Sequence, residues 1–347
     1  TALTYLNCAG NQLTSLDVSQ NTALTELLCY YNQLTSLDVS GATALTKLYC
    51  GYNQLTSLDV SNNIALSLLN CGGNQLINLD VSNNTALTNL RCAENNLLSL
   101  NVSGATVLDS LMCYDNQLSI LDVSNNTALT RLWCYENYLT SLYVSGATAL
   151  TNLYCGYNQL TSLDVSNNPS LTFLECLNNQ LINLDVNGAT ALNYLYCYDN
   201  QLPNLDVSAN TSLIALECRS NQITSLDVSN NTALTLLDCS SNQLTSLDLR
   251  NGNNTNIVFF SSLNNSNLYC IDVDDSTWAT NNWTWTGPFP SIDYHHYFSN
   301  NCSSTTDLQE HTTKKELLKV TDLLGRETKE TNQPLFYIYD DGTVEKR

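Results

Sequence analysis

The sequence predicts a mainly β protein, a solenoid of parallel strands with little or no helix. A 21-residue unit occurs twelve times between residues 1 and 249 without insertion or deletion, marked by a cysteine in every copy from Cys8 to Cys239. An asparagine follows each of these cysteines three residues later. Apolar and polar residues alternate around Leu27 and Leu37, which is the periodicity of a strand. A fixed period of this length is typical of repeats stacked along one elongated core.

Each repeat reads Leu-x-x-Leu-x-Cys-x-x-Asn-x-Leu-x-x-Leu-Asp-Val-Ser and ends in a polar bridge, Asn-Asn-Thr-Ala or Gly-Ala-Thr-Ala. We expect two short strands per turn, joined by two polar corners, with strands of successive turns paired in parallel. The leucines and valines, such as Leu24, Leu34 and Val39, then form inward columns. The asparagine carboxamide is expected at a corner, where it both donates to and accepts from backbone groups that point inward.

The cysteine column allows two interpretations. A row of thiols is a possible array for a soft metal ion. The other interpretation, which we favour, is a small apolar core residue, because no histidine lies near a repeated cysteine. Neighbouring rungs have parallel Cβ vectors that do not face each other, so we expect reduced, buried thiols instead of disulfides.

The segment Leu-x-x-Leu-x-Cys-x-x-Asn-x-Leu resembles the hallmark of the leucine-rich repeat family. The Leu-x-x-Leu-Asp-Val half echoes the first half, so the unit resembles a short bacterial 21-residue class with a nested repeat. The resemblance implies a right-handed solenoid whose Leu-x-Cys strands line a broad face, which is the usual ligand surface of the family. The nested second strand departs from the helix-backed members and argues against their strong curvature.

The repeat pattern breaks down over residues 250–302, which we interpret as a degenerate thirteenth turn and an irregular C-terminal cap. Ile257, Phe260, Asn265, Leu268 and Ile271 imitate a repeat with extra residues inserted. The aromatic residues that follow are expected to cover the last open turn; they are Trp278, Trp283, Trp285 and Phe289. Cys270 and Cys302 lie outside the column, on either side of this segment. We predict a disulfide between them if the protein is exported.

Residues 303–316 are polar and predict a linker, and residues 317–347 form a distinct tail. Alternating apolar residues and an Asp-Asp-Gly turn in the tail predict a small hairpin. Its Asp-Leu-Leu-Gly-Arg and Tyr-Asp-Asp-Gly-Thr-Val-Glu-Lys segments resemble the C-terminal sorting signal of the Bacteroidetes type IX secretion system. The resemblance implies export by that machinery and an extracellular or outer-surface location. Residue 1 lies inside a repeat with no capping element before it, so we expect a mature or trimmed chain.

The composition excludes several classes of function. The net charge is −20, and residues 1–249 contain four basic and nineteen acidic side chains. A nucleic-acid-binding protein needs a basic patch, and an anionic membrane surface also attracts basic residues. No apolar run approaches the length of a transmembrane segment. The histidines are His295, His296 and His311, all outside the repeats, so no pair of nucleophile and base stands out and we expect neither an enzyme nor a cofactor.

An aspartate column follows the second strand of most repeats, as at Asp17, Asp38 and Asp59, and Asn101 and Tyr143 interrupt it. Like charges about 5 Å apart repel by roughly 0.8 kcal/mol in water. Raised pKa values, hydrogen bonds to adjacent backbone or serine, or bound cations such as Ca²⁺ would each relieve this repulsion.

The most variable positions of the repeat flank the Leu-x-Cys strand and are rich in aromatic residues. We call these positions the aromatic face and expect them to face solvent. Its members are Tyr30, Tyr31, Tyr49, Tyr52, Met112, Tyr114, Trp133, Tyr135, Tyr154, Tyr157, Phe173, Tyr194, Tyr196 and Tyr198. The corresponding places on the Leu-Asp-Val strand are nearly all Thr, Ser or Asp.

Tyrosine, tryptophan and arginine are enriched where proteins bind each other. The sequence therefore predicts a non-enzymatic recognition or adhesion protein that binds a protein or polysaccharide ligand on the aromatic face. One alternative is a glycan-binding module that uses the same rings. Another is that the rings stack across strands and only stabilise the sheet. A structural or ice-binding rod is a further alternative, suggested by a column of threonines beside the aspartates.

Overall fold

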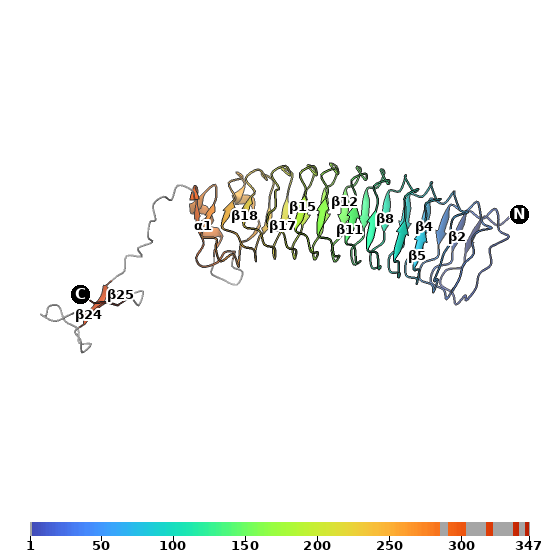
Figure 1. Ribbon diagram of the computed structural model, residues 1–347, viewed down its shortest axis with the longest axis horizontal. Helices are drawn as coiled ribbons and strands as arrows, with labels where there is room; N and C mark the ends of the chain where they lie inside the picture. The colour runs from blue at the N-terminus through green and yellow to red at the C-terminus, as the bar shows by residue number, and fades with distance from the viewer. Residues whose placement is uncertain (1, 285–290, 303–316, 322–335, 340–343, 347) are drawn as a thin grey trace. The chain divides into compact units, whose positions relative to one another are not determined.

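The computed structural model describes residues 2–284, 291–302, 317–321, 336–339 and 344–346. The chain forms two compact units, residues 1–300 and residues 301–347. The first unit is a gently curved stack of turns (Figure 1). Its only α-helix within the described residues is α1 (Ser276–Asn282), so the mainly β solenoid predicted from the sequence is confirmed.

One strand of each turn joins a parallel sheet of thirteen strands, which we call the main sheet. Each strand is three residues long, with a leucine or phenylalanine at its centre pointing into the core. In order, the strands are β1 (Tyr5–Asn7), β2 (Glu26–Leu28), β3 (Lys47–Tyr49), β4 (Leu68–Asn70), β6 (Asn89–Arg91), β8 (Ser110–Met112), β10 (Arg131–Trp133), β12 (Asn152–Tyr154), β14 (Phe173–Glu175), β16 (Tyr194–Tyr196), β17 (Ala215–Glu217), β19 (Leu236–Asp238) and β21 (Phe259–Ser261). Leu236 pairs with Phe259, so the thirteenth turn continues the sheet despite its inserted residues.

The second strand of each turn forms a row that is interrupted. Its strands are β5 (Asn78–Asp80), β7 (Ser99–Asn101), β9 (Ile120–Asp122), β11 (Ser141–Tyr143), β13 (Ser162–Asp164), β15 (Asn183–Asp185), β18 (Ser225–Asp227), β20 (Ser246–Asp248), β22 (Cys270–Asp272) and β23 (Tyr297–Ser299). They pair as β5–β7, β9–β11, β13–β15 and β18–β20–β22–β23. The first two turns contribute a single bridge between Asp17 and Asp38.

The glycine of the Gly-Ala bridge accounts for the bridge between the first two turns and for the pairs β5–β7, β9–β11 and β13–β15, whereas β18–β20–β22–β23 pairs without it. A Cβ atom at Gly146 would lie 1.7 Å from the carbonyl oxygen of Ser124 in the preceding turn. The same close approach occurs at Gly41, Gly104 and Gly188. Gly41 follows Asp38, the second residue of the Asp17–Asp38 bridge. Gly104, Gly146 and Gly188 follow β7, β11 and β15, which are the second strands of their pairs. The glycine of the Gly-Ala segment therefore allows two turns to approach closely beside the second strands. The sequence analysis did not assign this role to it.

The corners are held by the predicted asparagine column. In the second turn, Asn32 accepts from the backbone N–H of Leu13 and donates to the carbonyl oxygens of Cys8, Cys29 and Tyr30. This pattern continues to Asn265 of the thirteenth turn. The expectation that one carboxamide serves donors and acceptors of two turns is confirmed.

A second column of buried asparagines lies at the bridge. Asn126 donates to the carbonyl oxygens of Val102 and Ala105. Its Oδ1 atom has no hydrogen-bond partner among the described residues. The same holds for Asn63, Asn84, Asn168, Asn210 and Asn231.

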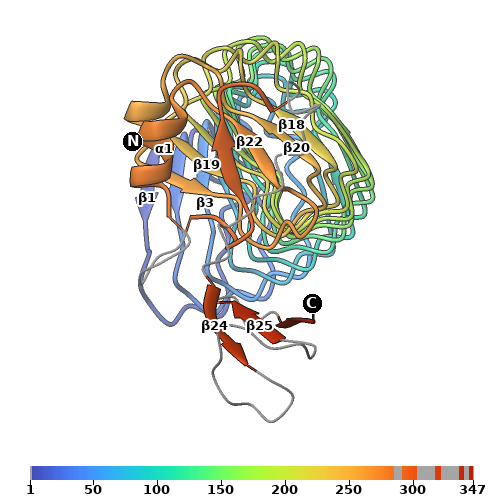
Figure 2. The same ribbon diagram turned by 90° about the vertical axis from the view of Figure 1, so that its left-hand side faces the viewer.

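The end of the stack is covered by the segment around α1, as Figure 2 shows in the view along the turns. Asp275 caps α1 by accepting from the backbone N–H groups of Thr277 and Trp278. Trp283 is buried, and its ring centroid lies 4.6 Å from that of Phe260 in the thirteenth turn and 5.8 Å from that of Phe298. Trp278 meets Trp283 edge-on. The covering role expected of these two tryptophans is confirmed, whereas Trp285 and Phe289 lie outside the described residues.

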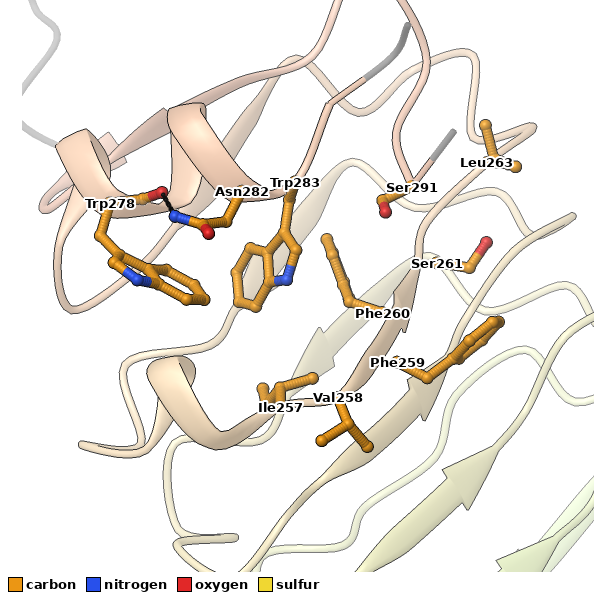
Figure 3. A pocket seen from close by; sticks show the side chains of 10 residues that line it. All are labelled: Ile257, Val258, Phe259, Phe260, Ser261, Leu263, Trp278, Asn282, Trp283 and Ser291. Atoms are coloured by element: carbon orange, nitrogen blue, oxygen red, sulfur yellow. Dashed lines mark hydrogen bonds between the residues drawn. The ribbon is translucent and has the colours of Figure 1, made fainter. Parts of the chain in front are cut away.

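A hollow of about 580 Å³ lies beside this cap, between β21 and α1 (Figure 3). A short 3-10 helix, η1 (Asn254–Asn256), precedes β21.

The second unit contains an antiparallel sheet of β24 (Leu317–Thr321), β25 (Phe336–Tyr339) and β26 (Val344–Lys346). Ile338 pairs with Val344, as expected for a hairpin around the Asp-Asp-Gly turn. The turn itself and the predicted linker, residues 303–316, lie outside the described residues.

Candidate functional site

The aromatic face is built by four positions of each turn on the outside of the main sheet. Two are the first and third residues of the strand, whose central leucine points inward. The other two are the two residues directly after the cysteine of the cysteine column, at the corner. Successive turns place equivalent residues side by side because Arg131 pairs with Asn152, Trp133 with Tyr154, and so on along the sheet.

The largest group of rings spans β10 to β16. Trp133 and Tyr154 stack with centroids 5.7 Å apart and an interplanar angle of 6°. Tyr154 lies 4.8 Å from Phe173, which in turn contacts Tyr194 at 6.0 Å and Tyr196 at 5.5 Å. These five rings form one continuous surface over four strands.

Smaller groups occupy the corners. Tyr31 stacks on Tyr52 with centroids 4.6 Å apart, and Tyr30 meets Tyr31 edge-on. Tyr114 and Tyr135 stack at 4.6 Å. No aromatic pair among the described residues includes Tyr49, Tyr157 or Met112. The fourteen residues therefore form separate groups on one sheet, and not a single stripe.

The solvent exposure of these residues differs from the expectation. Tyr31, Tyr52, Tyr157 and Tyr194 are exposed, whereas the other ten are half-buried. Rings on neighbouring strands cover one another, so the stacking alternative describes part of their environment. Stacking of this kind contributes about 0.5–1.5 kcal/mol per pair beyond the area buried.

The second corner position has an unusual backbone. Tyr31, Tyr52 and Tyr157 have φ of 52° each, in the left-handed region, and Glu94 and Glu136 have 57° and 53°. Glycine holds this place at Gly10 and Gly73. The other turns have nearly the same φ at residues such as Asp115, Asn178 and Ser220, so the left-handed corner is part of the repeat. Bulky residues rarely adopt this conformation, which makes tyrosine an unusual choice there. The sequence pattern gave no sign of this conformation.

Of the four basic residues that the structure describes on this side of the main sheet, three are paired with carboxylates, whereas Arg91 of β6 is exposed. Lys47 lies 3.6 Å from Glu26, and Arg131 lies 2.8 Å from Asp109. The guanidinium of Arg219 is 3.9 Å from the ring centroid of Tyr198 and also faces Asp199 and Asp238, at 3.6 and 3.8 Å.

The acidic residues leave the face negatively charged. Glu94, Asp115 and Glu136 occupy successive corners beside Tyr114 and Tyr135 and are exposed. Burial raises the pKa of Glu175 and of Glu217. Burial and nearby acidic groups, Glu94 among them, raise the pKa of the Tyr114 phenol, so this hydroxyl remains a protonated donor at neutral pH. Asp109, Glu94 and Asp115 were not singled out from the sequence.

The cysteines of the cysteine column belong to the core and not to the aromatic face. All twelve are free, and Cys29 to Cys239 are fully buried. Burial raises the pKa of Cys29 and of Cys113 to about 12, so the thiols are protonated and the expectation of reduced core residues is confirmed.

The aspartate column is satisfied locally. Asp38 accepts from the backbone N–H of Ser40 at 2.9 Å, and equivalent bonds occur at Asp17, Asp59 and Asp80. Hydrogen bonds from the side chain and the backbone N–H of the following serine lower the pKa of each of the four carboxyl groups. Of the expected ways to relieve their repulsion, hydrogen bonding is present, and the pKa values shift downward instead of upward.

Known proteins of similar structure share this architecture. The functional domain of InlJ from Listeria monocytogenes, described as including a cysteine ladder, is 30% identical, with a TM-score of 0.57 over 99% of this chain and 84% of its own. This chain belongs to the leucine-rich repeat family. A leucine-rich repeat protein of Leptospira interrogans is 25% identical, with a TM-score of 0.65 over 77% of each chain. The internalin InlF from Listeria monocytogenes is also 25% identical, with a TM-score of 0.54 over 79% of this chain and 87% of its own.

Two further comparisons add little. The LVIVD repeat family matches residues 113–140 of this leucine-rich repeat protein. None of the curated proteins matches it. The comparisons indicate no enzyme family. Among the described residues, no helix has both the length and the apolar character needed to cross a membrane.

Proposed function

We propose that this leucine-rich repeat protein is a secreted or cell-surface recognition or adhesion protein that binds a protein partner on its aromatic face. The observation that carries the proposal is the continuous group of Trp133, Tyr154, Phe173, Tyr194 and Tyr196 over four strands. Interfaces depend on a few aromatic or arginine anchors that are surrounded by near-neutral contacts. A rigid sheet holds these rings in place before the partner arrives, which lowers the entropy cost of binding.

The tyrosines at three of the left-handed corners support the same proposal. Tyr31, Tyr52 and Tyr157 adopt φ near 52° where glycine would be free of strain. All three side chains are exposed, so burial in the core does not explain the choice of tyrosine. A ligand that contacts the phenol groups would explain why tyrosine occupies these corners.

The charge of the face favours a basic partner. Lys47, Arg131 and Arg219 already face carboxylates of this chain. The three acidic corners Glu94, Asp115 and Glu136 therefore outweigh the single remaining cation of the face among the described residues, Arg91. Arg219 over Tyr198 shows that a guanidinium fits against a corner ring of this sheet. At Tyr114 and Tyr135, whose rings stack on each other, lysine or arginine side chains of a partner would pair with the neighbouring carboxylates of Glu94, Asp115 and Glu136.

A glycan ligand is less well supported by the ring geometry. Sugars stack on open ring faces, but the planes of Tyr31–Tyr52, Tyr114–Tyr135 and Trp133–Tyr154 are parallel within 10° and cover each other. The edges and hydroxyl groups of these rings remain available for contacts with a protein surface.

The proposed location rests on the cysteines and the tail. Cys270 and Cys302 are each disulfide-bonded, and disulfides persist in oxidising compartments. We propose that they pair with each other, which peptide mapping without reductant would test. We also propose that the tail, residues 317–347, is read by the type IX secretion machinery. Deleting it should abolish export without changing the fold of residues 1–300.

The binding proposal is tested by affinity capture from proteins and polysaccharides of the natural habitat. The bait is the full chain, and the variant is Trp133→Ala/Tyr154→Ala/Tyr196→Ala. Tyr138→Ala/Tyr143→Ala is the matched control, because these tyrosines are 56% and 53% exposed but lie outside the aromatic face. We expect a protein partner that the triple variant loses and the control keeps. Equal capture by both variants contradicts the proposal, and capture of polysaccharide alone favours the glycan alternative.

A further inference from the structure

A second constellation lies at the C-terminal cap, away from the aromatic face. Asp293, His295 and His296 occupy the segment between α1 and β23. Each offers a ligand atom, and these three atoms all lie within 4.8 Å of one another.

Asp293 is fixed by the thirteenth turn. Its Oδ1 accepts from the backbone N–H of Asn264 at 3.1 Å, and its Oδ2 accepts from that of Asn265 at 3.0 Å. Two backbone donors hold the carboxylate in one orientation and leave lone pairs on both oxygens.

His296 is buried beside it. Its Nε2 lies 3.4 Å from Asp293 Oδ2 and 3.3 Å from the carbonyl oxygen of Asn265. Its Nδ1 lies 3.4 Å from Ser262 Oγ. Ser262 is thus placed to orient the ring from Nδ1, while Nε2 faces Asp293.

His295 carries the decisive atom. Its Nε2 is buried and has no hydrogen-bond partner among the described residues. The ring is held by edge-on contacts with Tyr269, Tyr294 and His296. A buried polar atom without a partner calls for an explanation, and an ion is one of the few available.

We propose that Asp293, His295 and His296 bind a divalent transition-metal ion, of which Zn²⁺ fits best. Two imidazoles and a carboxylate suit Zn²⁺, whereas Ca²⁺ and Mg²⁺ prefer oxygen ligands alone. Zn–N and Zn–O distances of about 2.0–2.2 Å require the ligand atoms to approach to roughly 3.3 Å. The movement falls on an irregular segment between two regular elements.

The metal would join the thirteenth turn to the cap. Asp293 and His296 contact Ser262, Asn264 and Asn265, and β23 begins directly after them at Tyr297. Binding to the folded state alone stabilises it, so the ion would hold the cap on the end of the stack.

The test uses the full chain, stripped with a chelator and titrated with ZnCl₂ in a calorimeter. We expect one site and a rise of several degrees in the thermal midpoint of the wild-type chain. His295→Gln should weaken binding at least tenfold and remove the thermal shift. His311→Gln is the matched control and should retain both.

The variant should fold normally without metal, because His295 Nε2 has no hydrogen bond to lose; circular dichroism in chelator checks this. The Co²⁺ complex should lack the thiolate charge-transfer band that binding by the cysteine column would give. Absence of saturable Zn²⁺ binding, binding that His295→Gln leaves unchanged, or a thiolate band would each overturn the proposal.

Discussion

The side chain of Asn137 donates from Nδ2 to the carbonyl oxygen of Cys113, 3.0 Å away in the preceding turn. The same Nδ2 also donates to the carbonyl oxygens of Cys134 and Tyr135 in its own turn. Oδ1 accepts from the backbone N–H of Leu118, again in the preceding turn. One side chain thus satisfies a corner that both turns share, which explains why asparagine occupies this place in every repeat from Asn11 to Asn242.

Asn137→Ala should therefore be strongly destabilising. It removes the side-chain acceptor of the Leu118 N–H, and a buried donor left unsatisfied costs about 1–3 kcal/mol. With the lost carbonyl contacts, we expect a decrease of about 3 kcal/mol in the free energy of unfolding, measured by urea denaturation.

Asn126→Ala is the matched control. Asn126 is equally buried, but the carbonyl oxygens that it contacts also accept from backbone N–H groups, those of Ala105 and Leu108. Alanine also occupies the equivalent place at Ala105 and Ala147. We expect a loss of about 1 kcal/mol; equal losses for the two variants would show that the column at the corner has no special role.

The Gly-Ala bridge gives a second prediction. A Cβ atom at Gly146 would lie 1.7 Å from the carbonyl oxygen of Ser124, so Gly146→Ala must push two turns apart. We expect it to separate β9 from β11 and to cost about 1–3 kcal/mol, with faster amide hydrogen exchange confined to these two strands.

Gly72→Ala is its control. The added Cβ atom would lie 3.1 Å from the carbonyl oxygen of Ala93, and alanine holds the equivalent place at Ala9 and Ala93. If Gly146→Ala is tolerated as well as this control, close approach of the turns is not the reason for the glycine.

The sequence was enough to predict the strands, the inward columns and the asparagine corners, because each depends on a local pattern repeated twelve times. The pairing of turns was not predicted, because it depends on the distance between Gly146 and Ser124, which lie in different turns. The strain at Tyr31 and Tyr52 was missed for a related reason. The backbone angle φ is set by the corner, and the residue types at this position vary too much to reveal it. Asp293, His295 and His296 lie outside the repeats as neighbours in the sequence, and only the folded cap brings Asn265 and Ser262 to them.

The cysteine column predicts a loss of stability in alkali. Burial raises the pKa of Cys71 and Cys113 to about 12 in the folded chain, against about 8.5 when unfolded. Between these values the unfolded chain releases protons that the folded chain retains. Each such thiol therefore lowers the free energy of unfolding by about 1.4 kcal/mol per pH unit, and its full contribution is present only below the unfolded pKa.

We expect unfolding, followed by circular dichroism, to become steep above about pH 9. Tyrosines ionise in the same range, so Cys71→Ala/Cys113→Ala provides the comparison: it should be less stable at pH 7 yet lose less stability between pH 8 and pH 11. A parallel loss in both proteins would assign the alkaline transition to other groups.

The acidic corners predict how a partner arrives. If the partner is basic, Glu94 and Glu136 accelerate its encounter through long-range attraction, which salt screens. Glu94→Gln/Glu136→Gln should lower the association rate constant about two- to tenfold at low ionic strength and flatten its dependence on salt. The dissociation rate should change little, because both side chains are exposed. Surface plasmon resonance with the captured partner measures both rates, and Asp38→Asn/Asp59→Asn, on the opposite strand of the turn, is the charge-matched control. An association rate that is insensitive to salt in the wild-type chain would show that the partner does not recognise the negative charge of the aromatic face.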